Sequence, residues 1–418
     1  MTPWKHIQLV NARLDFGSDG HLEMGAILQA PGVTVFRYHS EFINDQTMEP
    51  SPIILPRNDV DYVGNANLGA PLTVFADSQP ETWARRILDD RLIAEGYDPT
   101  TLTALDRLAL VGENGVGALT YHPAHPRTDI IPSLNGASIR DVVMGTDNDI
   151  TRRRILEAMG GSLGGARPKV TAFSEGTKIN SREQPAMTPW ILKLPGSFDR
   201  PDKGAEEYAY AQMAGEAGIV MPRTLLHTNP DGPGDFAVER FDRDRGRRLH
   251  YHSYAGLCGL ALEAPSSYTS LFETAKRLTG LEDIQHIRRM AFNVMAVNRD
   301  DHVKNHGFLM DREGRWVTAP AFDLTFEPLK AHSLDVGGRR VGITVADMER
   351  AVSSAGWDPA PVKEIVNEVR HAVRNWRGHA RKAEVANDRI DQIEKAIAEA
   401  DPPEGRRRIV QVDRGMGF

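Results

Sequence analysis

The stretch Asn298–Asn305, which reads Asn-Arg-Asp-Asp-His-Val-Lys-Asn, constrains this chain more than any other feature. It follows the segment Leu281–Val297, in which apolar residues recur at spacings of three and four from Ile284 to Val294. This periodicity predicts a helix with one face in the core. Polar groups that leave a packed helix on a short loop are held in place by the core behind them, as a catalytic site requires.

The residues after this loop predict a β-hairpin. Two short apolar runs within residues 306–318 flank a turn at Asp311–Gly314. Because a hairpin returns the chain toward its start, we expect Asp323, in Ala-Phe-Asp-Leu, to lie beside Asp300 and Asn305.

The spacing of these polar residues is typical of phosphoryl transfer. Such a reaction needs a carboxylate to orient and deprotonate the attacking hydroxyl, oxygen ligands for Mg²⁺, and a cation on the phosphates. Protein kinases supply the first two with an Asp, an Asn five residues later, and an Asp beyond a hairpin. Asp300, Asn305 and Asp323 repeat that arrangement, which predicts an ATP-phosphate and metal centre.

Two other interpretations of this stretch remain. Asp and Asn are common in loops, where they cap helices and make turns. His302 and His306 are four apart and could bind a metal in a hydrolase, but no Glu follows the first His and no third ligand is evident.

A glycine-rich segment, Gly160–Lys169, precedes a predicted strand at Val170–Phe173. Its glycines would let backbone N–H groups approach an anion closely, although it matches neither a Walker loop nor Gly-x-Gly-x-x-Gly. Taken alone it could be a plain loop. It is followed by an apolar strand, Trp190–Pro195, that contains Lys193, and a Lys in such a strand is costly to bury unless it meets an anion. This order is that of a kinase nucleotide lobe.

The next elements fit the same interpretation. A helix is predicted over Gly204–Ala217, and Glu206 or Glu207 in its first turn could pair with Lys193. Acidic residues are also favourable there because of the helix dipole. The run Phe236–Arg243 predicts a strand that joins two lobes, and in kinases the backbone of such a connector holds adenine.

Length and composition set the broad class. The chain has 418 residues, 40% apolar and 26% charged, which fits a globular protein of two or three subdomains. Its formal net charge of −7 argues against broad nucleic-acid binding by this chain alone. The single Cys258 excludes a disulfide framework and fits a reducing cytoplasm. Neither a membrane span nor a signal peptide is expected.

We expect four parts along the chain. Residues 1–126 form a small α/β subdomain without chemistry of its own, with strands near 27–28 and 33–36, a helix over 80–94 capped by Asp77–Pro80, and a strand near 115–121. Residues 127–250 form the nucleotide-binding lobe. Residues 251–400 are mostly helical and carry the catalytic and metal residues, and residues 401–418 form a loose tail.

With these motifs in hand, the chain resembles the HipA family of serine/threonine kinase toxins from bacterial toxin–antitoxin systems. The resemblance covers nearly the full chain, and the stretches that carry it are Asp77–Arg86, Gly115–Leu119, Ser162–Lys169, Ile191–Lys193, Val238–Arg243, Asn298–Asn305 and Asp323. It implies an α+β, two-lobed protein-kinase-like fold with an extra N-terminal α/β subdomain and an all-α C-terminal lobe. It also implies an ATP- and Mg²⁺-dependent serine/threonine protein kinase.

The resemblance assigns roles to individual positions. Asp300 would be the catalytic base, and Asn305 and Asp323 would bind Mg²⁺. The ATP-binding positions that it implies are Ser162, Gly164, Gly165, Ala166, Lys169, Lys193, Glu239, Phe241, His302 and Lys304. Ser162 also falls where the family carries an inhibitory autophosphorylated serine. The residue after Asp300 is a second acid, Asp301, where other members carry a small residue. The sequence therefore does not decide which of the two acids is the catalytic base.

The family also implies partners. These are a small helix-turn-helix antitoxin similar to HipB, operator DNA through the antitoxin complex, and an aminoacyl-tRNA synthetase as the phosphorylated protein. Two other functions remain as alternatives. A small-molecule phosphotransferase would use a similar Asp-x₄-Asn and hairpin Asp, but the glycine-rich loop argues against it. A non-catalytic co-repressor with a helix-turn-helix partner would not need the intact set of Lys193, Asp300, Asn305 and Asp323.

Overall fold

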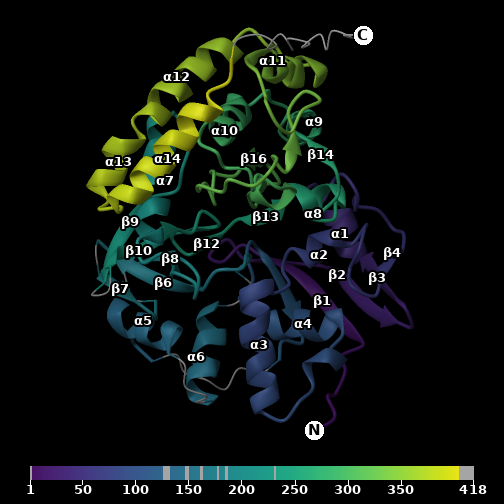
Figure 1. The fold of residues 1–418 in the computed structure, drawn as a ribbon. Helices are drawn as coiled ribbons and strands as arrows, with labels where there is room; N and C mark the ends of the chain where they lie inside the picture. Colours follow the sequence, from purple (N-terminus) through teal and green to yellow (C-terminus); the bar gives the residue numbers. More distant parts are fainter. Residues whose placement is uncertain are drawn as a thin grey trace, which may run out of the picture.

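The computed structural model describes residues 2–125, 132–145, 150–160, 163–176, 178–183, 187–229 and 232–403. Two five-stranded antiparallel sheets lie on opposite sides of the molecule, and a mainly helical region lies above both in Figure 1. The site predicted from the sequence lies where these three parts meet.

The N-terminal part is built on one sheet with the strand order β4-β3-β2-β1-β5. Its strands alternate buried and exposed residues, as in the burial of Val10, Ala12 and Leu14, so one face covers a core. Its elements are β1 (Leu9–Asp15), β2 (His21–Ala30), β3 (Val33–Tyr38), α1 (Ser40–Asp45), β4 (Tyr62–Asn65), α2 (Thr73–Ala76), α3 (Thr82–Ala94), the 3₁₀ turn Pro99–Thr101, α4 (Ala104–Val111) and β5 (Leu119–His122).

Most sequence predictions for this part are confirmed. Strands lie over residues 27–28 and 33–36, and α3 covers the predicted helix. The prediction that Asp77–Pro80 caps α3 is wrong, because the N-cap position is Glu81 and no side chain bonds there. Asp77 instead accepts hydrogen bonds from Ser253.

The second sheet has the strand order β7-β6-β8-β10-β9. In its register Lys193 on β8 lies opposite Lys169 on β6 and Phe236 on β10, so two lysines meet at one end of the sheet. The elements of this part are α5 (Gly136–Met144), α6 (Ile150–Gly160), β6 (Lys169–Glu175), β7 (Lys178–Asn180), β8 (Thr188–Lys193), α7 (Lys203–Glu216), β9 (Thr224–Asn229), β10 (Gly232–Glu239), β11 (Arg243–Asp244) and β12 (Arg247–Arg248).

Helix α3 shares a core with this second sheet. Trp83 and Ile87 of α3 belong to the same buried cluster as Leu156 of α6 and Leu192 of β8. Helix α3 of the N-terminal part thus packs beside α6 in the core of the second sheet (Figure 1). A division of the chain at residues 126, 250 and 400 stays a prediction.

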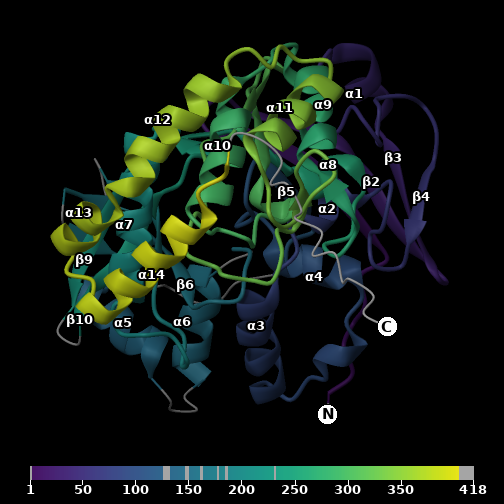
Figure 2. The ribbon, with the colours of Figure 1, turned by 45° about the horizontal axis from the view of Figure 1, so that its top comes forward.

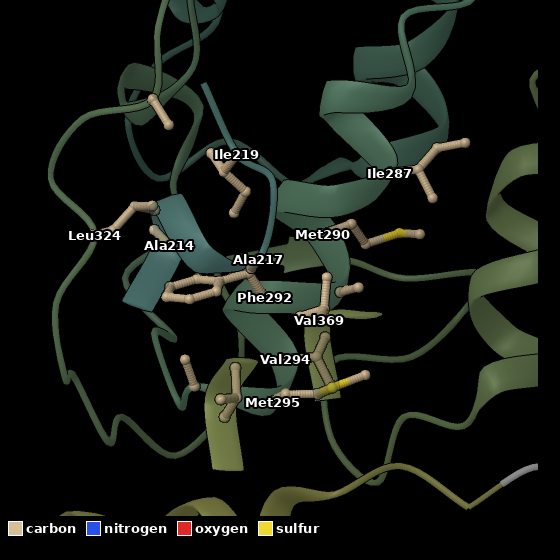
Figure 3. Packing of buried hydrophobic residues seen from close by; sticks show 14 of the residues in the cluster. Ala214, Ala217, Ile219, Ile287, Met290, Phe292, Val294, Met295, Leu324 and Val369 are labelled. Atoms are coloured by element: carbon tan, nitrogen blue, oxygen red, sulfur yellow. The ribbon is translucent and has the colours of Figure 1, made fainter. Parts of the chain in front are cut away.

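The C-terminal part holds the largest core. Figure 3 shows Phe292, Met290 and Met295 packed beside Ala214 and Val369. Its elements are β13 (His250–Ser253), α8 (Tyr254–Cys258), β14 (Ser266–Ser267), α9 (Tyr268–Thr279), α10 (Ile284–Met295), the 3₁₀ turn Val303–Asn305, β15 (Gly307–Met310), β16 (Trp316–Thr318), β17 (Leu334–Asp335), α11 (Val345–Ser354), α12 (Val362–Arg374), α13 (Trp376–Lys382) and α14 (Asn387–Ala400). Figures 1 and 2 both show α12, α13 and α14 grouped at one edge, beside α7.

The predicted helix and hairpin on either side of the loop 298–305 are confirmed as α10 and the antiparallel pair β15–β16. In α10 the buried stripe includes Ile287, Ala291 and Val294, whereas Ile284 is 44% exposed because it lies in the first turn. The structure adds β13, which pairs with β15 and makes the hairpin a three-stranded sheet within the helical region. Most of the predicted tail lies outside the described residues. Among the described helices, none is long and apolar enough to cross a membrane.

Candidate active site

The loop 298–305 begins where α10 ends, and buried amides fix its start. Asn298 is 2% exposed, and its side-chain Nδ2 donates to Asn293 Oδ1 at 2.9 Å. Val297, 1% exposed, adopts a φ of 56°, which a β-branched residue rarely does. Its carbonyl accepts from the backbone N–H of Glu327 at 3.1 Å. Packing and hydrogen bonds therefore hold a strained backbone just before the loop.

Asp301 is a buried anchor of this loop. It is 1% exposed, and its carboxylate accepts from Tyr268 Oη at 2.9 Å and from the Ser333 backbone N–H at 2.7 Å. His332 Nδ1 lies 3.1 Å from the same carboxylate. A carboxylate with this many partners and no exposure is poorly placed to take a proton from a substrate.

Asp300 has the opposite environment. Its side chain is 45% exposed, and His302 Nε2 lies 4.0 Å from its Oδ2. Partial burial raises the pKa of Asp300, the nearby His302 opposes that rise, and the negative charge of Asp323 adds to it. The effect of Asp323 on Asp300 agrees with the expectation that the hairpin brings these two residues close together. Of the two adjacent acids, Asp300 is the accessible one, and a raised pKa makes a carboxylate a better proton acceptor.

Asn305 closes the loop on itself. Its Nδ2 donates to the backbone carbonyl of Asp300 at 2.9 Å. Because this bond uses the amide nitrogen, the side-chain oxygen of Asn305 is left for another partner. An amide oxygen of this kind is a suitable ligand for a hard cation such as Mg²⁺.

Lys193 meets two carboxylates, as a Lys in an apolar strand should. Its Nζ lies 2.7 Å from Asp323 Oδ1 and 3.1 Å from Glu207 Oε2. Burial works against the charge on Lys193, but Asp323 and Glu207 outweigh it and raise its pKa above the usual range. Glu206 pairs instead with Lys203 at 2.6 Å. The structure thus decides the alternative between the two glutamates in favour of Glu207.

Asp323 is the link between β8 and the hairpin. The adjacent Lys193 holds the pKa of Asp323 well below its usual range, against the opposing effect of burial. Its side chain is 37% exposed and its backbone has a φ of 56°. An ionised carboxylate that reaches solvent beside a lysine fits a metal ligand, and together with Asn305 it offers the oxygen donors that Mg²⁺ prefers.

The glycine-rich loop lies over this centre. Gly165 has a φ of 93°, a left-handed conformation that favours glycine. Lys169 is 8% exposed and its Nζ donates to the Gly164 carbonyl. Burial lowers the pKa of Lys169, and the neighbouring Lys193 lowers it further. The predicted position Ala166 lies between these residues, and Ser162 lies outside the described residues.

Arg167 ties the same loop to the rest of the molecule. Its Nε lies 3.1 Å from Asp199 Oδ2 and its Nη2 lies 3.1 Å from Glu327 Oε1. Asp199 lies between β8 and α7, within the same part as the loop, whereas Glu327 links the loop to the C-terminal part.

Lys304 reveals a contact that the sequence analysis missed. Its Nζ forms an ion pair with Glu81, the residue at the start of α3. Glu81 Oε2 also accepts from the Gly165 backbone N–H at 2.8 Å. One residue of the N-terminal part thus contacts both the loop 298–305 and the glycine-rich loop, and the expectation that residues 1–126 lack chemistry of their own stays a prediction. The sequence did contain one indication of a role for Glu81, since Glu81 lies in Asp77–Arg86, a stretch that carries part of the resemblance to the HipA family.

The other predicted positions lie around this centre. His302 Nδ1 accepts from the Lys304 backbone N–H at 3.2 Å. β10 ends at Glu239, and the Phe241 ring lies 5.7 Å from the ring of Phe322, next to Asp323. The predicted connector and the predicted metal ligand are thus neighbours.

The metal-hydrolase interpretation gains no support. His306 is 2% exposed and its ring lies 5.7 Å from that of Tyr268. Among the residues that the structure describes, no group of three or more His, Cys, Asp or Glu side chains gathers as metal ligands. His306 is a core residue behind the loop.

The arrangement of sheet, connector, glycine-rich loop and catalytic stretch defines the class of a two-lobed protein-kinase-like fold. Sequence models place the chain within that class. The model of the HipA-like C-terminal domain matches residues 161–376, and the model of the HipA N-terminal domain matches residues 20–122. The chain belongs to the HipA family.

Two individual proteins are also similar to the chain. The protein named "Putative kinase Y4dM" from Sinorhizobium fredii is 27% identical over 269 residues, which is 60% of this chain and 61% of the relative. The alignment thus spans less than two thirds of that relative. HipA of Shewanella oneidensis MR-1, solved in complex with HipB and operator DNA, superposes with a TM-score of 0.68 at 14% identity, over 94% of this chain and 96% of that one. This likeness shows a shared fold and confirms the predicted fold class.

Proposed function

We propose that the chain is an ATP- and Mg²⁺-dependent serine/threonine protein kinase that acts as the toxin of a toxin–antitoxin module. The observation that carries this proposal is the convergence of Asp300, Asp323 and Lys193, from three separate elements, on one accessible centre. An accessible carboxylate beside an ionised carboxylate and a paired lysine is what phosphoryl transfer requires of a protein.

In the proposed reaction, Asp300 accepts the proton of a Ser or Thr hydroxyl as that oxygen attacks phosphorus. Its raised pKa favours this step, since a more basic carboxylate is a better proton acceptor. Asn305 and Asp323 would hold Mg²⁺, which neutralises charge on the phosphates when bound. Lys193 would contact the phosphates, and Glu207 orients it through the contact at 3.1 Å.

Nucleotide binding is proposed for the surrounding loops. The backbone of residues 239–241 would hold adenine beside the Phe241 ring. The amides of Gly164, Gly165 and Ala166 would approach the phosphates, as left-handed glycine backbone allows. The side chains of Lys169, His302 and Lys304 complete the proposed set.

The proposed partners follow from the family. A HipB-like helix-turn-helix antitoxin would bind this chain, and operator DNA would be contacted only through that complex. The HipA of Shewanella oneidensis was solved with HipB and its operator, which supports the first part of this proposal. The proposed target is an aminoacyl-tRNA synthetase, whose phosphorylation would inhibit translation.

Autophosphorylation of Ser162 is the proposed off-switch. A phosphate brings about −1.5 to −2 charges into a loop built to hold an anion. Arg167, five residues later in the sequence, could pair with this phosphate if it left Asp199 or Glu327. The phosphorylated form should bind ATP poorly. Intact-mass measurement after incubation with ATP–Mg²⁺, followed by ATP titration of both forms, tests this, and equal affinity of the two forms would contradict it.

Quantitative phosphoproteomics after brief induction tests the function itself. Wild-type chain should add phosphate to a Ser or Thr of a translation enzyme, and Asp300→Ala should not. The same phosphorylation sites at the same levels with both chains would show that the proposed activity is wrong.

A further inference from the structure

Two groups proposed to contact phosphate are both bonded to one internal carboxylate. Glu81 Oε2 lies 2.8 Å from the Gly165 backbone nitrogen, and Glu81 Oε1 pairs with Lys304 Nζ. Burial opposes the charge on Lys304, but Glu81 outweighs it and raises the pKa of Lys304. One backbone amide and one ammonium group on the same anion is also the arrangement that holds a phosphate oxygen.

Glu81 is fixed in this place by its neighbours in the sequence. Asp77, four residues earlier, accepts from the Ser253 backbone N–H at 2.9 Å and from Ser253 Oγ at 2.8 Å. His252 Nδ1 lies 2.8 Å from the same carboxylate. Two residues after Glu81, the Trp83 backbone N–H donates to the Gly165 carbonyl at 3.3 Å. The start of α3 is therefore attached to the C-terminal part on one side and to the glycine-rich loop on the other.

The loop is shaped around this carboxylate. A Cβ placed on Gly164 would lie 2.9 Å from Glu81 Oε2, which is closer than Cβ atoms approach other heavy atoms in folded proteins. Glu81 and Lys304 side chains are 33% and 32% exposed, so the pair is reachable from solvent. A dissolved anion can thus reach the position that Glu81 fills.

We propose that Glu81 is an internal competitor for the terminal phosphate of the nucleotide, and that nucleotide binding displaces its carboxylate from Gly165 and Lys304. This inference rests on the proposed function, since it assumes that these two residues meet ATP. Two anions on one amide and one ammonium repel each other, so only one can hold the site. Displacement also removes one of the two contacts between the start of α3 and Gly165, which links the N-terminal part to the state of the site.

Calorimetric titration of Glu81→Gln with ATP–Mg²⁺ and with adenosine tests the proposal. Glutamine keeps the size of the side chain and removes its charge. ATP should bind about tenfold more tightly, which is the size of one like-charge contact removed near a protein surface. Adenosine, which has no phosphate, should bind as it does to the wild type. The matched control is Asp90→Asn, which removes one charge from the same helix and should leave ATP affinity unchanged.

Weaker or unchanged ATP binding by Glu81→Gln would overturn the proposal and make Glu81 a positioning residue for the loop. An equal change for adenosine would overturn it as well, because the effect would not concern phosphate. Failure of both folded wild type and Glu81→Gln to bind ATP would instead contradict the proposed function.

Hydrogen exchange in the wild-type chain gives a second measurement that needs no variant. ATP–Mg²⁺ should speed exchange of the Trp83 amide, because its hydrogen bond to Gly165 loses the neighbouring Glu81–Gly165 contact that holds the same two segments together. Adenosine should not. Slower or unchanged exchange of the Trp83 amide with ATP–Mg²⁺ would contradict displacement.

Discussion

In the loop 298–305 the anchoring side chains are buried and held mainly by hydrogen bonds, whereas in the loop 163–169 the anchors are ion pairs that reach solvent. Asp301 is 1% exposed, while the Arg167 side chain is 32% exposed. The first loop, 298–305, is packed against the hydrophobic core to which α10 contributes. The second is held by carboxylates from three distant parts of the chain: Glu81, Asp199 and Glu327.

This difference suits the two halves of the proposed reaction. The carboxylate that accepts the proton must keep one position, and a buried hydrogen-bond network beside it restricts its movement. The loop that receives a nucleotide must exchange its partners, and partly exposed ion pairs cost little to break. Variants that remove one anchor from each loop should therefore differ strongly in their effect on stability.

The largest effect on stability is expected for Asp301→Ala. It leaves Tyr268, His332 and the Ser333 amide without their buried partner and should lower the free energy of unfolding by about 4 kcal/mol. Urea unfolding measures this. The matched control, Asp300→Ala, removes an adjacent acid that is 45% exposed and should change stability by less than about 0.5 kcal/mol. Equal stability of the two variants would contradict the conclusion that the buried Asp301 anchors the loop and the exposed Asp300 does not.

A smaller loss is expected for Lys193→Met. The substitution removes the cation between Glu207 and Asp323, of which Glu207 is 5% exposed and Asp323 is 37% exposed. We expect about 2 kcal/mol, because only one of the two carboxylates is left fully buried. ATP affinity should fall as well. Unchanged ATP affinity in a calorimetric titration would show that Lys193 is structural only.

The pH dependence of that loss has a definite sign. Asp323 has a lowered pKa, so its share of the stability is present above the unfolded value of about 4 and is lost as pH falls through the folded pKa. Lys193 has a raised pKa, so its share is present below about 10.4 and is lost as pH rises through the folded pKa. The stability gap between wild type and Lys193→Met should be widest between these limits. A gap that closes near neutral pH would contradict the pairing.

The smallest effect is expected for Arg167→Gln, which breaks both ion pairs of the glycine-rich loop. Because these pairs are partly exposed, the loss should be about 0.5–1 kcal/mol and should shrink further in high salt. Thermal unfolding at two salt concentrations measures it. If Arg167→Gln lowered the free energy of unfolding as much as Asp301→Ala does, ion pairs would stabilise the glycine-rich loop as strongly as buried hydrogen bonds stabilise the loop 298–305.

Much of the site could be predicted from the sequence because its signals are local. The apolar spacing of α10, the turn chemistry at residues 311–314 and a lone Lys193 in an apolar strand are each visible within about 18 residues. Together they placed Asp300, Asn305, Asp323 and Lys193 in one centre, and the structure brings them together.

The rest depends on contacts between distant residues. Glu207 rather than Glu206 faces Lys193 because of how α7 is rotated against β8. Glu81 reaches Lys304 across more than half of the chain, and Asp77 bonds Ser253 instead of capping its own helix. Burial of Asp301 beside an exposed Asp300 is likewise a tertiary property, since two adjacent acids look alike in a sequence.

The single-turnover rate of phosphate transfer from ATP to the target protein tests the central claim most directly. Asp300→Ala should bind ATP as the wild type does and transfer phosphate roughly 10²–10⁴-fold more slowly, the usual size of a lost general base. The rate for the wild type should also fall as pH drops through the raised pKa of Asp300, whereas the residual rate of the variant should not. A wild-type rate in Asp300→Ala, with the activity lost in a folded Asp301→Asn chain instead, would contradict the assignment of Asp300 as the base.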